Sequence, residues 1–288
     1  MKKIITIVIL ILVISSSSFV YLHKRYSPPA ELEVHFIDVG QGDATLIRTP
    51  SGKNMLIDAA TKSKSALVSD YIKSEGVKKL DVVIATHPDE DHIGGMTDII
   101  KKFDIGTFYM PNKMHNTITF EHMLVLLKKE NILVSEALSG NIIPFDEEME
   151  LLVLNPENKD YPNNNAFSIA TKLTYQDTSF LFTGDIEAIN EYAMINNFGE
   201  NLQSKVIKLA HHGSNSSNSP DFLKTVRPVA AVVSCAYNNQ YNHPSESVLK
   251  TLKNLGIPLY RTDLQGSIVF FSDGKTINVN QTSPYESE

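Results

Sequence analysis

The fold is decided by the stretch Thr86-His87-Pro88-Asp89-Glu90-Asp91-His92-Ile93-Gly94-Gly95. Two imidazoles and two carboxylates, besides that of Glu90, lie within six positions, and such density is costly unless a cation neutralises it. The preceding run, 80–85, is short and apolar, which is typical of a buried strand. We therefore expect these side chains on a loop at the strand's end, where the glycine pair lets the chain turn sharply and the ligands converge on one or two divalent ions. The alternative is a solvated acidic loop.

Two further apolar runs end in residues of the same kind. Phe182-Thr183-Gly184-Asp185 ends one run with a carboxylate, and Lys208-Leu209-Ala210-His211-His212-Gly213-Ser214 ends another with two imidazoles. Each motif alone is weak, because Gly-Asp is common in turns and paired histidines are often surface residues. Active sites of layered α/β folds are commonly assembled at the carboxyl ends of several strands. Together the three motifs predict one metal site.

The rest of the sequence predicts strands that are first paired as hairpins and later separated by helices. Strands at 32–39, 43–48 and 54–57, separated by glycine-containing turns, form an antiparallel meander. We expect further strands at 80–85, 149–154, 167–175, 179–183, 205–210, 229–234, 257–260 and 266–271. We expect helices at 64–75, 97–103, 118–130, 186–197, 220–226 and 245–255. This order indicates a mixed, layered α/β fold.

The first 25 residues differ from the rest of the chain. Two lysines precede a run at 4–14 that is apolar except for Thr6, and a second apolar stretch follows at 19–22. A charged start before an apolar run is typical of an export signal, and about 20 residues can span a bilayer. A cleaved signal peptide and a retained membrane anchor both stay open, and a buried core helix is the alternative to export. We expect a protein secreted or anchored on the outer face of the cytoplasmic membrane.

Beyond this segment we expect a linker at 26–30, one folded domain at 31–280 and a polar tail at 281–288. The chain has 288 residues, of which 42% are hydrophobic and 20% charged, enough for a sizeable core. Cys235 is the only cysteine, so an intramolecular disulfide is excluded. Residues 26–288 carry 22 basic and 33 acidic residues, a net charge of −11, which disfavours non-specific capture of nucleic acid.

With the three motifs in this order, the sequence resembles the metallo-β-lactamase superfamily, and more closely the hydrolase domain of the ComEC competence proteins. The resemblance begins with Phe36-Ile37-Asp38-Val39-Gly40-Gln41-Gly42-Asp43-Ala44 and continues through the metal loop. It ends with His243-Pro244 and Arg261-Thr262-Asp263-Leu264-Gln265-Gly266. It implies a four-layer αββα sandwich with two adjacent metal sites along one edge.

The resemblance also implies a ligand set for two divalent ions, zinc or manganese: His87 and Asp89 for the first, Asp91, His92 and His212 for the second, and Asp185 bridging both. His211 would lie just outside the coordination shell, although the two neighbouring histidines could exchange roles. Asp91 would also orient the nucleophile.

The sequence departs from the superfamily's pattern in two places. Asp89 stands where a histidine is common, and the segment 162–168 lacks a further histidine expected before the strand that leads to Asp185. Asn164 or Asn165 could replace that imidazole or face substrate, and an asparagine-rich turn is an equal alternative. Oxygen-rich coordination favours harder ions such as manganese, whereas zinc prefers imidazole and thiolate, so the metal stays open.

Other polar residues are candidates for contact with substrate. His243 follows a polar loop, 237–242, that could carry its imidazole toward substrate as a general acid or phosphate-binding group. His243 or His211 would protonate or steady the leaving oxygen, and Ser214 is a candidate substrate-binding residue. His35 alternates with apolar neighbours in the first strand, so we expect it to be structural. The remaining histidines outside any cluster, for which we expect no catalytic role, are His23, His115 and His122.

These observations predict an exported metal-dependent hydrolase, a phosphodiesterase or nuclease whose phosphodiester substrate could be DNA. The alternatives are a hydrolase of a cell-wall phosphodiester or of a small ester or lactone, and a non-catalytic, metal-stabilised binding module. An uncleaved N-terminal segment would make the membrane a partner, and no protein partner can be inferred.

Overall fold

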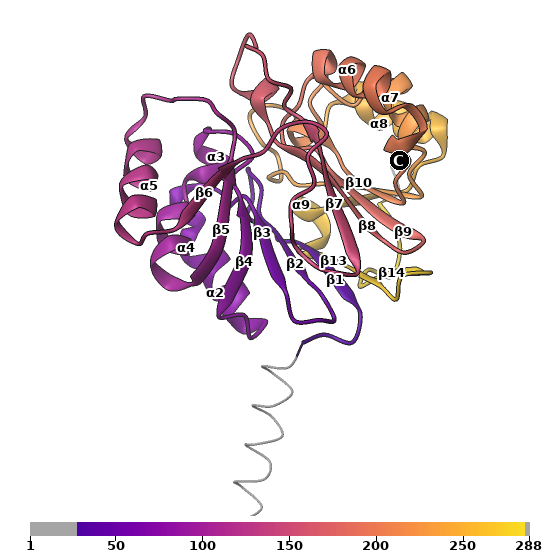
Figure 1. Ribbon diagram of the computed structural model, residues 1–288. Helices are drawn as coiled ribbons and strands as arrows, with labels where there is room; N and C mark the ends of the chain where they lie inside the picture. Colours follow the sequence, from indigo (N-terminus) through magenta and orange to yellow (C-terminus); the bar gives the residue numbers. More distant parts are fainter. Residues whose placement is uncertain (1–27, 286–288) are drawn as a thin grey trace, which may run out of the picture.

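Four layers make up the protein, two β-sheets packed face to face and a set of helices on the outer side of each (Figure 1). The structure is a computed structural model, and it describes residues 28–285. The expected αββα sandwich is confirmed.

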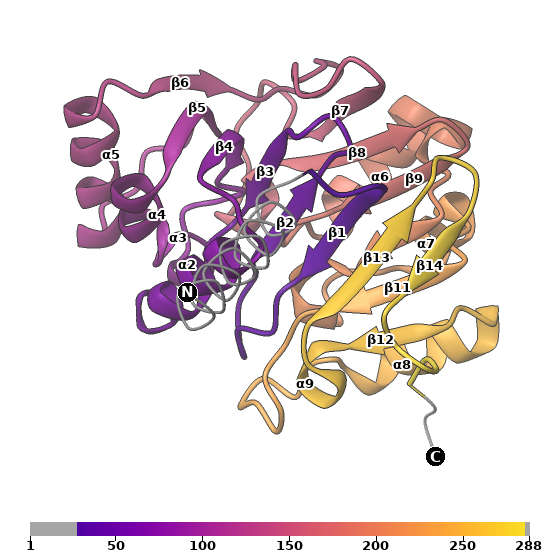
Figure 2. The ribbon, with the colours of Figure 1, turned by 90° about the horizontal axis from the view of Figure 1, so that it is seen from below.

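The first sheet has eight strands in the order β14-β13-β1-β2-β3-β4-β5-β6 (Figure 2). Their bounds are β1 Leu32–Phe36, β2 Thr45–Arg48, β3 Asn54–Ile57, β4 Lys79–Ile84, β5 Asp104–Met110, β6 Leu133–Glu136, β13 Ile268–Ser272 and β14 Ile277–Val279. Pairing is antiparallel from β14 to β3, which confirms the expected meander, and parallel from β3 to β6. The associated helices are η1 Lys62–Lys64, α2 Ser65–Ser74, α3 Glu90–Ile93, α4 Met96–Lys102 and α5 Ile118–Lys129.

The second sheet has six strands in the order β12-β11-β10-β9-β8-β7. Their bounds are β7 Met149–Asn155, β8 Ala170–Tyr175, β9 Thr178–Phe182, β10 Val206–Lys208, β11 Ala230–Val233 and β12 Leu259–Arg261. Pairing is antiparallel between β7, β8 and β9 and parallel from β9 to β12. The helices of this half are η2 Asn165–Phe167, α6 Ala188–Phe198, η3 Gly199–Leu202, η4 Ala210–Gly213, α7 Pro220–Val226, α8 Glu246–Leu255 and α9 Thr262–Gln265.

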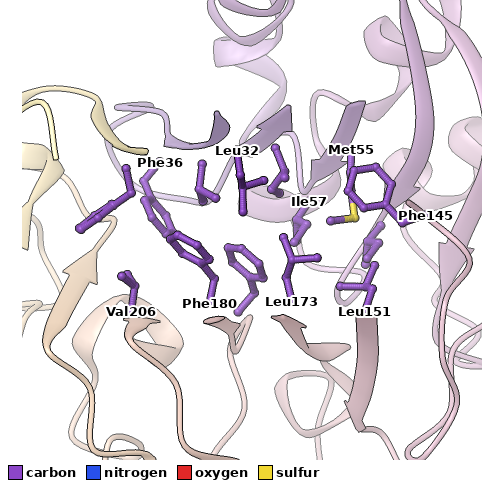
Figure 3. Packing of buried hydrophobic residues seen from close by; sticks show 14 of the residues in the cluster. Leu32, Phe36, Met55, Ile57, Phe145, Leu151, Leu173, Phe180 and Val206 are labelled. Carbon is purple, nitrogen blue, oxygen red and sulfur yellow. The ribbon is translucent and has the colours of Figure 1, made fainter. Parts of the chain in front are cut away.

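The central core lies between the two sheets. Leu32 and Phe36 of β1 meet Phe180 of β9 and Leu173 of β8 there, and all four side chains are buried (Figure 3). The neighbouring positions on the strands face the helices instead, as Leu46 does, so both faces of the first sheet are apolar. Because both faces of the sheets are covered, strands such as β4 and β11 read as nearly continuous apolar runs.

The parallel strands bring their carboxyl ends to one edge of the sandwich. In the first sheet β4 runs parallel to β3, and in the second sheet β9, β10 and β11 run parallel to one another. The three ligand motifs follow β4, β9 and β10 directly, so the fold gathers them at this edge.

The described residues can be compared with the segments expected at the two ends of the chain. Within residues 28–285, no helix is long and apolar enough to cross a bilayer. The segment expected as signal or anchor, 1–25, lies outside the described residues, as does His23. At the other end, the backbone N–H of Tyr285 donates to Leu259 O at 2.6 Å, so the chain contacts the domain beyond residue 280.

Candidate metal centre

The loop after β4 carries four of the expected ligands, but its glycines do not act as expected. Residues Glu90–Ile93 form the short helix α3, and Gly94 and Gly95 have right-handed φ values of −55° and −83°. A sharp glycine turn is therefore wrong. A Cβ at Gly94 would lie 2.3 Å from Lys62 N, and one at Gly95 would lie 2.2 Å from Ala59 O. These glycines allow the helix to pack against the segment after β3.

Asp185 lies at the centre of the cluster. Its Oδ2 is 3.3 Å from His92 Nε2, 3.5 Å from His212 Nε2 and 4.0 Å from His87 Nε2. The Nε2 atom of His211 lies 3.8 Å from the same oxygen. A carboxylate in this position can contact two neighbouring cations, as the expected bridging ligand must.

Asp89 and Asp91 lie on the more open side of the cluster, with side chains 37% and 32% exposed. Asp89 Oδ2 is 3.8 Å from His87 Nε2, whereas Asp91 Oδ2 is 3.2 Å from His212 Nε2. Asp89 therefore lies next to His87, and Asp91 lies next to His212.

His92 is oriented by Asp58, a residue that the sequence motifs did not include. Its Nδ1 donates to Asp58 Oδ2 at 2.7 Å, and the same carboxylate accepts from the Thr86 backbone N–H at 2.8 Å and from its hydroxyl at 2.7 Å. With Nδ1 donating to Asp58, Nε2, which faces Asp185, is the nitrogen that can bind a metal. Asp58 follows β3 directly, so the strand-end signal that found the other ligands could have found it too.

The other two buried histidines are oriented in the same way. His212 Nδ1 lies 2.9 Å from the Ser234 carbonyl, which can only accept, so this nitrogen donates. His87 Nδ1 lies 3.2 Å from Ser168 Oγ and 3.0 Å from Thr86 Oγ1. All three imidazoles thus direct Nε2 toward Asp185.

The donor set fits divalent cations. His92 Nε2 and Asp185 Oδ1 are buried and have no hydrogen-bond partner among the described residues. Unpaired buried polar atoms are costly unless they coordinate an ion. His87, His92 and Asp185 form one group of converging ligand atoms, and Asp91, His92 and His212 form another. Imidazole and carboxylate together suit zinc, manganese and iron.

The pKa values in the cluster also favour bound cations. Burial would raise the pKa of Asp185, but His92 and His212 outweigh it and hold that pKa well below its usual range. Burial would lower the pKa of His92, but Asp185 and Asp58 raise it well above the ordinary value. Burial and the neighbouring His92 lower the pKa of His87. The carboxylates draw positive charge into the site, and bound divalent ions would supply it.

The asparagines of segment 162–168 reach the cluster. Asn164 Nδ2 donates to Asp89 Oδ1 at 2.8 Å and lies 3.1 Å from His115 Nε2. Asn165 Nδ2 lies 3.5 Å from both ring nitrogens of His211. Asn164 therefore positions the Asp89 carboxylate. His115, expected outside any cluster, is brought to the rim by the loop before α5, and no local pattern in the sequence marks it.

The histidine pair after β10 has unusual backbone geometry. His211 and His212 both lie in the left-handed region, with φ values of 50° and 53°. Such residues cost about 1–3 kcal/mol each and persist where the surroundings hold them. His212 is buried, whereas the His211 side chain is 25% exposed and lies on the solvent side of Asp185.

His243 lies beside the histidines of the site, whereas Ser214 bonds within its own turn. The His243 ring lies 5.7 Å from that of His211 and 6.4 Å from that of His212, and its Nδ1 is buried without a hydrogen-bond partner in the described chain. Burial and the two neighbouring histidines lower the pKa of His243 to about 4. Ser214 is buried, and its hydroxyl accepts from the Ser216 backbone N–H at 3.2 Å and contacts the Ser216 hydroxyl at 3.0 Å. The structure therefore gives Ser214 a local role in its turn.

A buried ion pair lies behind the histidines. Lys208 Nζ is 2.6 Å from Asp43 Oδ2, and both residues are buried. Asp43 Oδ1 is 3.6 Å from His212 Nδ1, and its Oδ2 is 3.8 Å from His92 Nδ1. Asp43 belongs to the segment 36–44, with which the family resemblance begins. It lies too far from the ligands in sequence for this contact to be predicted from the sequence.

His35 lies apart from the cluster. Its Nδ1 is 3.0 Å from the Tyr71 hydroxyl, and its Nε2 is 3.2 Å from Glu33 Oε2. The first contact joins β1 to α2, which covers it, and the second lies within β1, in keeping with the structural role expected for His35.

Two mixed sheets with histidine and aspartate ligands at their shared edge define a metal-binding αββα protein. Residues 37–237 match the family model of the metallo-beta-lactamase superfamily, and the chain belongs to that superfamily.

Relatives give a closer comparison. The chain is 28% identical over 275 residues to ComE operon protein 3 of Bacillus subtilis, covering 90% of this chain and 35% of that protein. It is 29% identical over 255 residues to competence protein ComA of Neisseria gonorrhoeae, covering 88% and 34%. The chain thus spans about a third of these relatives' length. The metallo-beta-lactamase fold protein YhfI of Bacillus subtilis superposes with a TM-score of 0.58 at 11% identity, covering 84% of this chain and all of YhfI.

Proposed function

We propose that this protein is a metal-dependent phosphodiesterase. The observation that carries the proposal is the position of Asp185 Oδ2, within 4.0 Å of the Nε2 atoms of His87, His92 and His212. With Asp89 and Asp91 beside them, these ligands can hold two cations close together. Such a pair suits a phosphodiester, because negative charge accumulates on the phosphoryl oxygens during cleavage.

The proposed ions are two divalent cations, manganese or zinc. His87 and Asp89 would hold one, Asp91 and His212 would hold the other together with His92, and Asp185 would contact both. Ions held by these residues would lower the pKa of bound water, so that it could attack at neutral pH, and would neutralise charge on the phosphoryl group.

The chain's own residues have three tasks in this proposal. The Asp91 side chain is 32% exposed, and its carboxylate orients the attacking water. His211 is partly exposed beside Asp185, in reach of a group bound above the cluster. His211 or His243 steadies the leaving oxygen, and the Asn164 amide keeps Asp89 in place at 2.8 Å.

The resemblance to competence proteins makes DNA the first substrate to test, and the net charge of −11 over residues 26–288 argues against binding through many phosphates. A cell-wall phosphodiester and a small ester or lactone are the other substrate classes. We further propose that the domain acts outside the cytoplasmic membrane, on the pattern of residues 1–25. Protease treatment of intact cells or protoplasts tests this: an exported domain is digested, and protection until lysis would contradict export.

The activity test uses the full-length chain. Single-stranded DNA, double-stranded DNA and bis(p-nitrophenyl) phosphate are offered with manganese, zinc or magnesium in turn. We expect hydrolysis that needs added metal and is lost in Asp185→Asn, while the control Asp221→Asn, at an exposed position of α7, keeps it. Metal binding without hydrolysis of any of these substrates would refute the phosphodiesterase proposal and leave an ester or lactone hydrolase or a binding module.

A further inference from the structure

Three aromatic rings lead outward from the metal centre. The ring of His243 lies 6.4 Å from that of the ligand His212, at an interplanar angle of 29°. The ring of Tyr241 lies 5.7 Å from that of His243 at 27°. Tyr241 therefore ends a column of roughly parallel rings that starts at a metal ligand.

The loop that carries this column is held in one shape by Asn239. Its amide nitrogen donates to the carbonyl oxygens of Ala236 at 2.8 Å and His243 at 2.6 Å. Its amide oxygen accepts from the backbone N–H groups of Tyr241 at 3.1 Å and His243 at 3.0 Å. One side chain thus closes the loop, so the position of the Tyr241 ring is set before a ligand arrives.

Tyr241 remains 56% exposed although its ring packs on His243. A held aromatic ring with a solvent-facing side, next to a catalytic site, can accept another planar ring. Proteins that hold a single nucleic-acid strand combine aromatic side chains, on which bases stack, with basic residues that contact the phosphates. The net charge of −11 over residues 26–288 makes the phosphate contacts weak here, so stacking would carry more of the binding.

We propose that Tyr241 is a specificity-determining residue whose outer face stacks on an unpaired nucleobase of the substrate. This inference rests on the proposed phosphodiesterase function and adds to it the part of the substrate that is recognised. Bases within a duplex are covered by their neighbours, so the stacking requires an unpaired base. Because stacking carries no charge, binding depends weakly on salt.

The test compares two single-stranded oligodeoxynucleotides of equal length, one of thymidines and one abasic throughout, with the full-length, metal-loaded chain. Tyr241→Ala should lower kcat/KM for the thymidine strand about tenfold, as loss of a base-stacking aromatic does, and leave the abasic strand unchanged. Tyr241→Phe keeps the ring and should retain wild-type values. Tyr192→Ala is the matched control, because Tyr192 of α6 is 71% exposed and lies outside the loop.

The outcomes separate the two proposals. If the wild-type chain cleaves both strands and Tyr241→Ala affects them equally or not at all, the stacking role is wrong and the phosphodiesterase function stands. If the wild-type chain cleaves neither strand nor bis(p-nitrophenyl) phosphate with any ion, both proposals fall. A steep loss of thymidine-strand binding between low and high salt, as several phosphate contacts would give, would also overturn the stacking role.

Discussion

Asp58→Asn tests how the protein prepares a histidine for metal binding. The Asp58 carboxylate accepts from the Thr86 backbone N–H through Oδ1, and from the Thr86 hydroxyl and His92 Nδ1 through Oδ2. An asparagine has only one acceptor oxygen. If that oxygen keeps the bond to the backbone N–H, the amide nitrogen faces His92 Nδ1. Nδ1 must then accept, and the ring proton moves to Nε2, the atom needed for the metal.

The substitution should change metal affinity much more than it changes the stability of the fold. Loss of a partner that orients a metal-binding histidine typically lowers metal affinity about 10- to 100-fold. A hydrogen bond to a charged group contributes about 1.5–3 kcal/mol to stability. Burial raises the pKa of Asp58, so a neutral amide recovers part of the cost of the buried charge. We therefore expect Asp58→Asn to lower the metal affinity about 10- to 100-fold. The free energy of unfolding should fall by less than about 1.5 kcal/mol.

Chelator competition measures the metal affinity, and thermal unfolding of the metal-free protein measures the stability. Asp81→Asn is the control: Asp81 also accepts a backbone N–H, from Asn54 at 3.1 Å, but lies in β4, away from the ligands. Wild-type metal affinity in a folded Asp58→Asn variant would refute the reasoning.

Three further substitutions test the site. Asp185→Asn should leave the protein folded but remove most metal and phosphodiester turnover, because one carboxylate contacts both ion positions; wild-type metal content and turnover would contradict a two-ion site. Asp89→His should shift the ion preference from manganese toward zinc when metal-free protein is titrated with each, since it adds a nitrogen beside His87, and an unchanged preference would count against the argument. His35→Asn should keep turnover but lower the free energy of unfolding by about 1–3 kcal/mol in denaturant titration, through lost bonds to Tyr71 and Glu33. A stable, inactive variant would instead assign His35 to catalysis.

Much of the fold follows from local patterns. The run expected as a strand at 80–85 is β4 at Lys79–Ile84, and the helix expected at 245–255 is α8 at Glu246–Leu255. The strand expected from 167 starts only at Ala170, because Asn165–Phe167 forms a 3-10 turn that carries the asparagines toward the site. Periodicity identified most of the elements but gave no bounds for β5, β6 and β14, and side-chain contacts at the ends of other elements moved their boundaries.

The candidate site was predicted less completely. Clustered ligands such as His87 and Asp91 are recognisable in the sequence, because so many carboxylate and imidazole side chains directly after a buried strand are costly to bury unless they share a cation. Asp58 directly follows β3, where the same strand-end signal could have marked it, whereas Asp43 is a single carboxylate whose partners lie far away in sequence, so only the folded chain reveals its role. The prediction of a sharp turn at Gly94 was wrong because the reason for this glycine is also a contact distant in sequence. Its lack of a Cβ lets the backbone pass close to Lys62.

The division of the ligands between the two sheets has a consequence for the whole molecule. His87 and His92 follow a strand of the first sheet, whereas Asp185 and His212 follow strands of the second. Ions held by both sets would cross-link the two halves at one edge. Because an ion that binds only the native state stabilises it in proportion to the logarithm of its free concentration, the persistence of this fold would depend on the metal supply around it.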